Sequence, residues 1–203
     1  MTDQMHADHL DAAHLDSGHL PATLADRALA SMRAMAHGTL ADLERLTHPA
    51  AVNREAVDEP PAASTPGAAG FWATAQWLRT AFSDLAFEIH EVVTDGDLVV
   101  VHNTMTGRHT GDFVGWDHGQ IKVVMPPTGR EFASTQTHWM RFRDGLLVEH
   151  WANRDDFGTA EQLGWAPPSP AFLFRQVRAT RRARRRLARE QAAQARQQLG
   201  DNS

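Results

Sequence analysis

Two Asp-Gly pairs constrain the second half of this chain most strongly, because each stands between stretches of alternating polarity. These pairs are Asp95-Gly96 and Asp144-Gly145. An Asp-Gly pair flanked by alternating apolar residues is a strong short-range signal of a β-hairpin. The sequence therefore predicts long antiparallel strands joined by tight turns. The predicted strands cover residues 87–94, 98–106, 121–125, 133–142 and 146–153.

Helical patterns precede these strands. Apolar residues recur at helical spacing from Leu24 to Leu46, with an interruption near Gly38, and again from Phe71 to Phe82. Between them, Pro60-Pro61 through Gly70 is a turn-rich segment long enough to serve as a lid or an entrance. Early helices followed by hairpin-linked strands, without a βαβ repeat, predict an α+β fold.

The two ends of the chain differ in composition from its body. Residues 1–20 are rich in His and Asp and lack an apolar period, so we expect a disordered or frayed leader rather than a signal peptide. Such a His-rich tract could hold a divalent metal loosely, but it has no rigid ligand geometry, and we predict no metal site. The domain is expected at residues 21–166, followed by a Pro linker and an Arg-rich helical tail at 167–203.

Composition narrows the class further. The 203 residues are 42% hydrophobic, which is enough for one domain with its own core. No apolar run is long enough to cross a bilayer, and without cysteine there is no disulfide framework or thiolate nucleophile. These features predict a cytoplasmic protein.

Charge is concentrated in the tail. From Arg175 onward nine arginines face only Glu190 and Asp201, so this segment has a net charge of +7 and the remaining chain −12. The tail could contact a membrane surface or another anionic partner. A solvated helix that packs its Phe residues on the body or on a second subunit is the favoured interpretation. Because no aromatic residue interrupts the arginine run, we expect no specific nucleic-acid binding.

The segment Glu149 to Asp155 is the strongest candidate for chemistry. In a strand, residues two apart share a face, so Trp151, Asn153 and Asp155 are expected to point one way and His150 the other. An apolar ring beside a carboxylate raises the pKa of that acid and makes it a usable general base. On the preceding strand, His138 shares a largely apolar face with Gln136 and Met140, where a neutral imidazole could stabilise an enolate; a hydrogen-bonded core histidine is the alternative.

The order of several short motifs resembles the SnoaL-like polyketide cyclases, also called ester cyclases. The resemblance runs from about Leu24 to Gly164 and rests on Thr110-Gly111-Asp112-Phe113-Val114-Gly115, Pro126-Pro127-Thr128-Gly129-Arg130, Arg143-Asp144-Gly145, Glu149-His150-Trp151, Asp155 and Gln162-Leu163-Gly164. It implies the cone-shaped α+β fold shared with ketosteroid isomerase and nuclear transport factor 2, in which a curved antiparallel sheet and helices enclose one apolar pocket. It also implies a cofactor-free reaction in which an aspartate removes a C–H proton and the carbanion closes a ring by aldol attack.

The resemblance assigns roles to particular residues. Asp155 matches the aspartate that follows E-H-W and is the predicted acid/base, whereas Asp156 is expected to cap the next helix. His138 is the second predicted catalytic residue. The predicted substrate-binding residues are Trp151, Asn153, His109 and Asn53. The alternative role for His109 is to shape the turn before Phe113.

Two departures from the family pattern concern the pocket. Ala51-Val52-Asn53-Arg54 stands where the family often has an Asp-His pair, so Asn53 is expected at a pocket position without a second acid/base group. Residues 116–125 lengthen a connection that is usually short, and are expected to cover or narrow the pocket.

The predicted function is therefore ring closure on a polyketide-like or other 1,3-dicarbonyl substrate, without a cofactor, by a homodimer. The same pocket could instead serve a dehydratase, a hydratase or an isomerase. A third hypothesis is a protein that binds a small hydrophobic molecule without catalysis.

Overall fold

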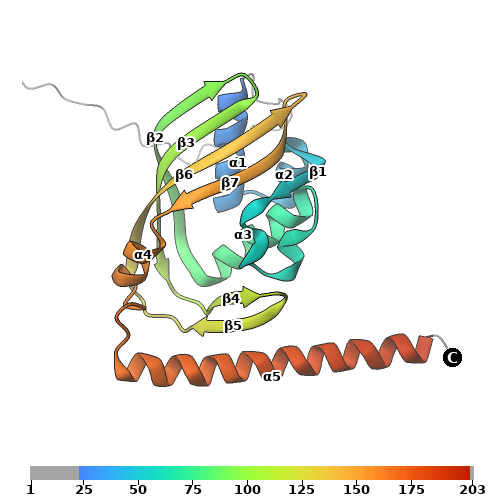
Figure 1. Ribbon diagram of the computed structural model, residues 1–203, viewed down its shortest axis with the longest axis vertical. Helices are drawn as coiled ribbons and strands as arrows, with labels where there is room; N and C mark the ends of the chain where they lie inside the picture. The colour runs from blue at the N-terminus through green and yellow to red at the C-terminus, as the bar shows by residue number, and fades with distance from the viewer. Residues whose placement is uncertain (1–22, 202–203) are drawn as a thin grey trace, which may run out of the picture.

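The computed structural model describes residues 23–201, and the predicted leader at residues 1–20 lies outside this range. A curved sheet wraps around helices on one side, and a long helix lies at one end of the molecule (Figure 1). The helices on the concave side are α1 (Leu24–His37), α2 (Leu40–Leu46) and α3 (Ala68–Ala81). Thr23 and Thr39 cap α1 and α2, each accepting a backbone N–H and completing a capping box with Asp26 and Asp42.

The main sheet has five strands in the order β1-β7-β6-β3-β2. Their bounds are β1 (Thr47–Asn53), β2 (Phe82–Asp95), β3 (Leu98–His109), β6 (Glu131–Arg143) and β7 (Leu146–Arg154). Neighbours are antiparallel except that β1 runs parallel to β7. The sheet is therefore mixed, not wholly antiparallel as predicted, because the chain leaves α2 and adds a strand to the free edge of β7.

Both predicted hairpins form, although in the first one Asp95 pairs with Leu98 and the two loop residues are Gly96 and Asp97. At the β6–β7 turn Asp144 and Gly145 have φ values of 51° and 76°, the left-handed pair that a two-residue turn between twisted strands requires. Arg27 of α1 donates to the carbonyl oxygen of Gly145 at 2.7 Å, so this turn is also tied to the first helix.

A second, two-stranded sheet lies between the body and the last helix (Figure 1). It consists of β4 (Phe113–Asp117) and β5 (Gln120–Met125). The chain then returns through β6 and β7 to α4 (Asp156–Gln162) and α5 (Pro170–Asp201), which packs along β5. Two short 3-10 helices, η1 (Arg54–Val57) and η2 (Pro61–Ser64), connect β1 to α3.

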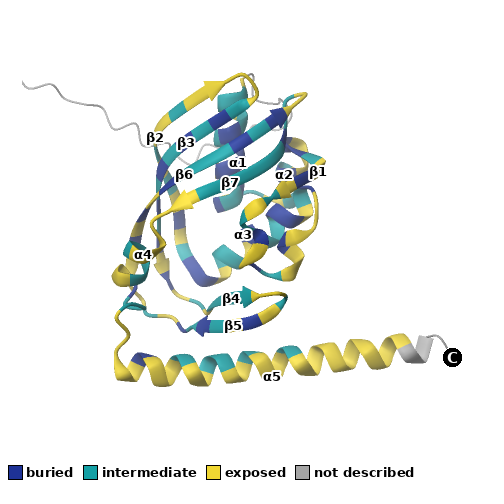
Figure 2. Cartoon of the chain, viewed as in Figure 1, coloured by how far each residue is buried: buried dark blue, intermediate teal, exposed yellow. Residues whose placement is uncertain are grey.

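The core lies between the helices and the concave face of the sheet. Alternate residues of β3 and β6 are buried, among them Val99, Val101, Met140 and Phe142, and they pack against Ala28 and Met32 of α1 together with Leu43 and Phe71. By contrast, α5 is exposed over most of its length (Figure 2). Phe172 is buried but Phe174 is 69% exposed, so only the first of these two rings packs on the body.

The predicted α+β class is confirmed, and the expected elements are present, including the helix break at Gly38 and a helical tail. The sequence analysis missed β1 and β4. Residues 47–53 have a Pro and an irregular polarity, and residues 113–117 contain Gly115 within only five residues, so neither has a usable alternation. None of the helices in the described range has the length and apolar character needed to span a membrane.

Candidate active-site cavity

A cavity of about 450 Å³ lies inside the cone, between the helices and the concave face of the sheet. Its wall is largely apolar, with side chains that include Met32, Met35, Leu43, Phe71, Trp77, Leu78, Phe82, Phe87, Met105, Phe113, Phe132 and Met140. Polar groups gather on one part of the wall. They include Asn53, Glu59, Thr74, Gln136, His138, His150 and Arg154. An apolar pocket with a few convergent polar groups is the usual form of a small-molecule site.

Strand β7 turns toward the cavity the face opposite to the one that the sequence predicted. His150, Ala152 and Arg154 pair with the inward-facing Met140, His138 and Gln136 of β6, and both His150 and Arg154 line the cavity. Two-residue alternation therefore holds, but Trp151 and Asn153 lie on the convex side. There the Trp151 ring stacks on Trp139 with centroids 6.0 Å apart, and Trp139 Nε1 donates to Asn153 Oδ1 at 3.3 Å.

The substrate-binding roles predicted for Trp151 and Asn153 are thus inconsistent with this placement. His150, which was expected to point away from the predicted site, is the residue of this strand pair that reaches the cavity. Local alternation could not choose between the faces, because both faces of residues 149–154 carry polar groups.

Asp155 does not line the cavity. It is an exposed residue that caps α4, and its Oδ1 accepts the backbone N–H of Gly158 at 2.8 Å. The strand ends at Arg154, and Asp155 has a ψ of 72°, so strand alternation does not extend to it. The predicted division is reversed: Asp155 is the cap, while Asp156 follows in the first helical turn at the cavity wall, 3.5 Å from Arg154 Nε.

His138 and Asn53 occupy the cavity wall as expected, whereas His109 does not line it. His109 is the last residue of β3 and is buried, with its Nδ1 3.2 Å from Thr128 Oγ1 and its ring centroid 5.1 Å from that of Trp165. It holds the Pro126 to Arg130 turn against the lower core, which is not the turn before Phe113 that the sequence suggested.

A chain of four side chains crosses the polar wall. Gln136 Oε1 lies 2.8 Å from His138 Nε2, His138 Nδ1 lies 2.9 Å from His150 Nε2, and His150 Nδ1 lies 3.0 Å from Asn53 Oδ1. The amide group of Asn53 continues the chain, with Nδ2 3.5 Å from both Glu59 Oε2 and Thr74 Oγ1. These groups come from β1, β6, β7, α3 and the η1–η2 connection, so only the folded chain assembles them.

The imidazoles of His138 and His150 in this hydrogen-bonded chain are held neutral. Burial lowers the pKa of His138 to about 4, with Arg154 as a second cause, and burial also holds the pKa of His150 well below its usual value. Each neutral ring carries one N–H group, so the two rings have two protons for the three contacts of this hydrogen-bonded chain. The amide oxygens of Gln136 and Asn53 at its two ends can only accept. One terminal amide must therefore turn its NH₂ toward the chain, or the two rings must share one added proton.

Glu59 is the buried carboxyl group of this wall, with 6% of its surface exposed. Thr74 Oγ1 donates a short hydrogen bond to Glu59 Oε2. Burial raises the pKa of Glu59 despite that hydrogen bond and the nearby positive charge of Arg154. Sequence reasoning did not identify this residue, because Asp58-Glu59 before Pro60-Pro61 looks like an ordinary solvated loop.

The β4–β5 hairpin forms one end of the cavity. Residues 116–125 supply Trp116, Lys122 and Val123 to its wall, as expected for an insertion that narrows the pocket. The indole N–H groups of Trp116 and Trp165 are buried without a hydrogen-bond partner in the described part of the chain, and both rings line the cavity. Unpaired donors beside a cavity can bind a ligand oxygen.

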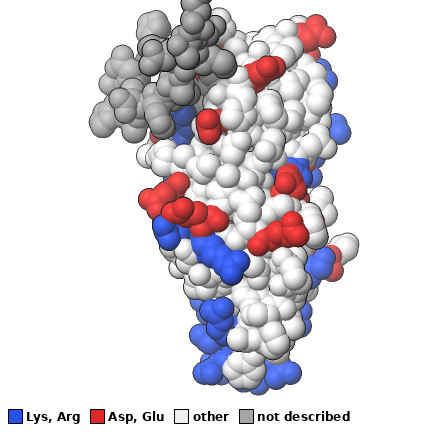
Figure 3. Space-filling view, turned by 90° about the vertical axis from the view of Figure 1, so that its left-hand side faces the viewer, with Lys and Arg blue, Asp and Glu red and all other residues white. Residues whose placement is uncertain are grey.

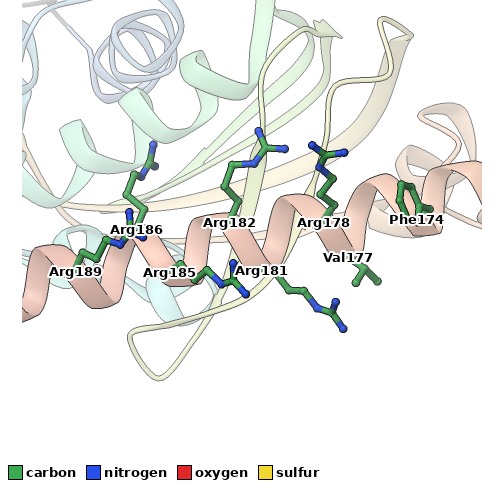
Figure 4. Close-up of a pocket in the computed structure, with 8 residues that line it drawn as sticks. All are labelled: Phe174, Val177, Arg178, Arg181, Arg182, Arg185, Arg186 and Arg189. Atoms are coloured by element: carbon green, nitrogen blue, oxygen red, sulfur yellow. The ribbon is translucent and has the colours of Figure 1, made fainter.

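A second hollow of about 680 Å³ runs along α5 and is chemically different. It is lined by Phe174, Val177 and six arginines, several of which project on opposite sides of the helix (Figure 4). Lys and Arg side chains gather at this end of the molecule, while acidic side chains occupy its middle and upper parts (Figure 3). With no carboxylate or neutral imidazole in its lining, this hollow lacks acid/base groups.

Comparison with known proteins agrees with the geometry of the body. The family model for the SnoaL-like polyketide cyclase matches residues 24–163. Aklanonic acid methyl ester cyclase DnrD of Streptomyces peucetius is 33% identical over 150 residues, which cover 73% of this chain and 96% of that protein. Nogalonic acid methyl ester cyclase of Streptomyces nogalater is 37% identical over 89 residues, covering 43% of this chain and 60% of that protein.

Solved structures of similar proteins share the fold of the body. IdmH from Streptomyces antibioticus superposes with a TM-score of 0.55 at 30% identity, covering 70% of this chain and 99% of that one. TsrD from Streptomyces laurentii gives a TM-score of 0.54 at 25% identity, with 68% and 92% coverage. The match to the family model ends at residue 163, before α5.

Proposed function

This chain belongs to the SnoaL-like polyketide cyclase family, and we propose that its cavity closes a ring in a polyketide-like or other 1,3-dicarbonyl substrate. The reaction is acid/base catalysis without a cofactor. A proton leaves the carbon between two carbonyl groups, and the resulting enolate attacks another carbonyl of the same molecule. The methyl ester cyclases that this chain resembles support that substrate class.

The observation that carries the proposal is the neutral Gln136–His138–His150–Asn53 chain on the wall of an apolar cavity. A substrate carbonyl oxygen can replace the Gln136 amide oxygen as the acceptor of the His138 Nε2–H group. As charge develops on that oxygen, a preorganised donor in a dry site stabilises the enolate more than the ketone. His138 is central in the chain and is hydrogen-bonded on both ring nitrogens, so its ring orientation is fixed.

The apolar wall has two further effects. It excludes water from the enolate, which strengthens each hydrogen bond made to it. Its aromatic side chains, among them Phe71, Trp77 and Phe87, also hold a flexible substrate in a compact conformation. That conformation favours attack within one molecule over reaction with solvent. The roughly 450 Å³ volume is in the range of pockets that enclose a small organic ligand.

Deuterium exchange tests the proposal. Purified protein is mixed with methyl 2-methylacetoacetate in D₂O, and loss of the single α-hydrogen is followed by NMR. Exchange above the buffer rate is expected, with a fall of about 10²-fold or more in His138→Phe. Val93→Ala, on an exposed edge strand, serves as the control for purification and handling. Exchange that is equal in the wild type and His138→Phe would contradict the role of the histidine chain.

Product analysis separates ring closure from its alternatives. With a tricarbonyl ester as substrate, ring closure leaves the molecular mass unchanged, dehydration lowers it by the mass of one water, and hydration raises it by that amount. Ligand binding without enzyme-dependent exchange in either substrate would favour the non-catalytic binding protein.

A further inference from the structure

We infer that Glu59 supplies the carboxylate that removes the substrate proton, in place of the exposed Asp155. This inference rests on the proposed function and names its base. It follows from the position of Glu59 in the cavity wall, from the way its two oxygens are used, and from the placement of the other carboxyl groups nearby.

The inner face of β7 offers no carboxyl group, because it consists of His150, Ala152 and Arg154. Ala152 lies directly opposite His138, so the position beside the central imidazole carries only a methyl group. An acid/base carboxyl for this part of the cavity must come from another element. The η1–η2 connection lies over the same wall, joined to it through Asn53.

Other carboxyl groups at the cavity are already engaged or exposed. Glu55 uses Oε1 to accept the backbone N–H of Ala152 at 3.0 Å and Oε2 to pair with Arg154 Nη2 at 3.2 Å. Asp156 has 78% of its side chain exposed. Asp58 is exposed as well.

Glu59 differs from these three in burial and in hydrogen bonding. Its Oε2 accepts from Thr74 and more distantly from Asn53, which fixes the carboxyl plane. Within the described residues no group donates to Oε1. One oxygen is therefore held and the other is open, the arrangement expected of a general base.

Ring closure with Glu59 as the base needs no further reactant. The C–H bond between two substrate carbonyls breaks, its proton passes to Glu59 Oε1, and its electron pair becomes the enolate. The enolate carbon then bonds to a carbonyl carbon of the same molecule, and the electron pair of that C=O bond becomes an alkoxide. The proton on Glu59 passes to the alkoxide, which regenerates the carboxylate and leaves the ring-closed product.

The raised pKa of Glu59 agrees with this role, because burial makes the carboxylate a stronger base than an exposed one. The open Oε1 takes up and returns the proton, while Oε2 stays hydrogen-bonded to Thr74 and Asn53.

The test compares Glu59→Gln with Asp155→Asn. Both changes remove one negative charge at nearly constant size, but only Glu59 lies in the cavity, and Asn remains a good helix cap at position 155. Exchange of methyl 2-methylacetoacetate is measured by NMR, and binding of the same ester by quenching of tryptophan fluorescence. Folding is checked by thermal unfolding.

Glu59→Gln is expected to lose about 10² to 10⁴ in enzyme-dependent exchange while its Kd for the ester changes less than about threefold. Asp155→Asn is expected to keep the wild-type rate. A Glu59→Gln variant that exchanges at more than about a third of the wild-type rate would overturn the inference and leave the proposed function intact. Loss of exchange in Asp155→Asn alone would restore Asp155 as the base.

A second measurement does not depend on turnover. Infrared titration of ¹³C-glutamate-labelled protein, with Glu59→Gln subtracted, isolates the carboxyl band of Glu59. A midpoint above that of exposed glutamates, shifted when the ester binds, is the expected result. A midpoint at or below the ordinary value, unchanged by the ester, would refute the buried base even for a protein that shows no exchange.

Discussion

His138 and His150 form a stacked, hydrogen-bonded pair inside the cavity, with Nδ1 of His138 2.9 Å from Nε2 of His150 and ring centroids 5.2 Å apart. The two rings belong to neighbouring strands, and each is fixed at its other nitrogen by an amide, from Gln136 or from Asn53. They therefore act as one unit, and removing either ring leaves a buried partner without its hydrogen bond.

We expect strong non-additivity in this pair. His138→Phe and His150→Phe should each slow α-hydrogen exchange by about 10²-fold or more, but the double variant should be little worse than either single variant. The measurement is a double-mutant cycle on the exchange rate, with unfolding free energies from urea titration as a parallel cycle. Additive effects on exchange would show that the rings act separately.

Stability should fall in mild acid because of His138. Its pKa is about 4 in the folded protein and about 6.5 when unfolded, so the unfolded chain binds more protons between these values. The free energy of unfolding therefore decreases as the pH falls from about 6.5 to about 4, by about 3 kcal/mol in total, since each pKa unit corresponds to about 1.4 kcal/mol. His150 acts in the same direction.

The variant His138→Gln removes this titration and keeps a polar side chain. Urea unfolding at about pH 7.5 and about pH 5 should show the wild type losing roughly 2 kcal/mol more than the variant. Glu59 has a raised pKa and so works in the opposite direction, but it is present in both proteins and cancels in the comparison. Equal losses would mean that His138 titrates at its ordinary value when folded.

Asp155 should matter for stability and not for turnover. Asp155→Ala removes the acceptor for the Gly158 N–H and should cost about 1 kcal/mol, whereas Asp155→Asn should cost a few tenths. Thermal unfolding and the exchange assay together check this. A turnover defect shared by both variants, without a matching loss of stability, would contradict the capping role.

Helix α5 should hold the hairpin that closes the cavity. Arg184 donates to the carbonyl oxygens of Ile121 and Lys122, both at 2.8 Å, and Thr180 Oγ1 accepts the N–H of Val124 at 2.9 Å. Lys122 and Val123 line the cavity, so the helix acts on the pocket through β5. Arg184→Ala is expected to raise the Kd for the ester several-fold with little change in the rate at saturation.

Arg181→Ala is the matched control for Arg184→Ala. It removes the same charge from the same helix without contacting the hairpin in the described residues. Fluorescence binding curves at two salt concentrations separate hairpin positioning from long-range charge, because only the latter is screened. Equal weakening by both variants would favour a general electrostatic effect of the tail.

We propose that the convex face of the sheet forms the homodimer. Trp139 and Trp151 stack there as a half-buried pair, with the guanidinium of Arg54 5.4 Å from the Trp151 ring centroid. Large aromatic side chains with arginine are typical of interface centres. Sedimentation at about 10 µM should give a dimer for the wild type and a monomer for Trp139→Ala/Trp151→Ala. Phe174→Ala, at an exposed ring on α5, should remain dimeric.

The sequence alone determined the α+β class and the places of the two hairpins. Asp144-Gly145 needs left-handed backbone at both positions, and few other pairs satisfy that requirement, so the turn could be located from two letters. Periodicity predicted α1, α3 and the long strands, because periodicity is also a property of the local sequence. Gln136 and His138 were also placed on one face correctly, since β6 is regular along its length.

Only the tertiary structure decided which face of β7 meets the cavity and which carboxyl group belongs to it. His150 and Trp151 are adjacent and both are compatible with burial, and the choice between them was made by pairing with β6 and by the helices that cover one side of the sheet. Asp155 lost the predicted role because the face assigned to it with Trp151 and Asn153 is the convex one, and because it caps α4. Glu59 gained its position through β1, η1 and Thr74, contacts that are distant in sequence and have no local pattern.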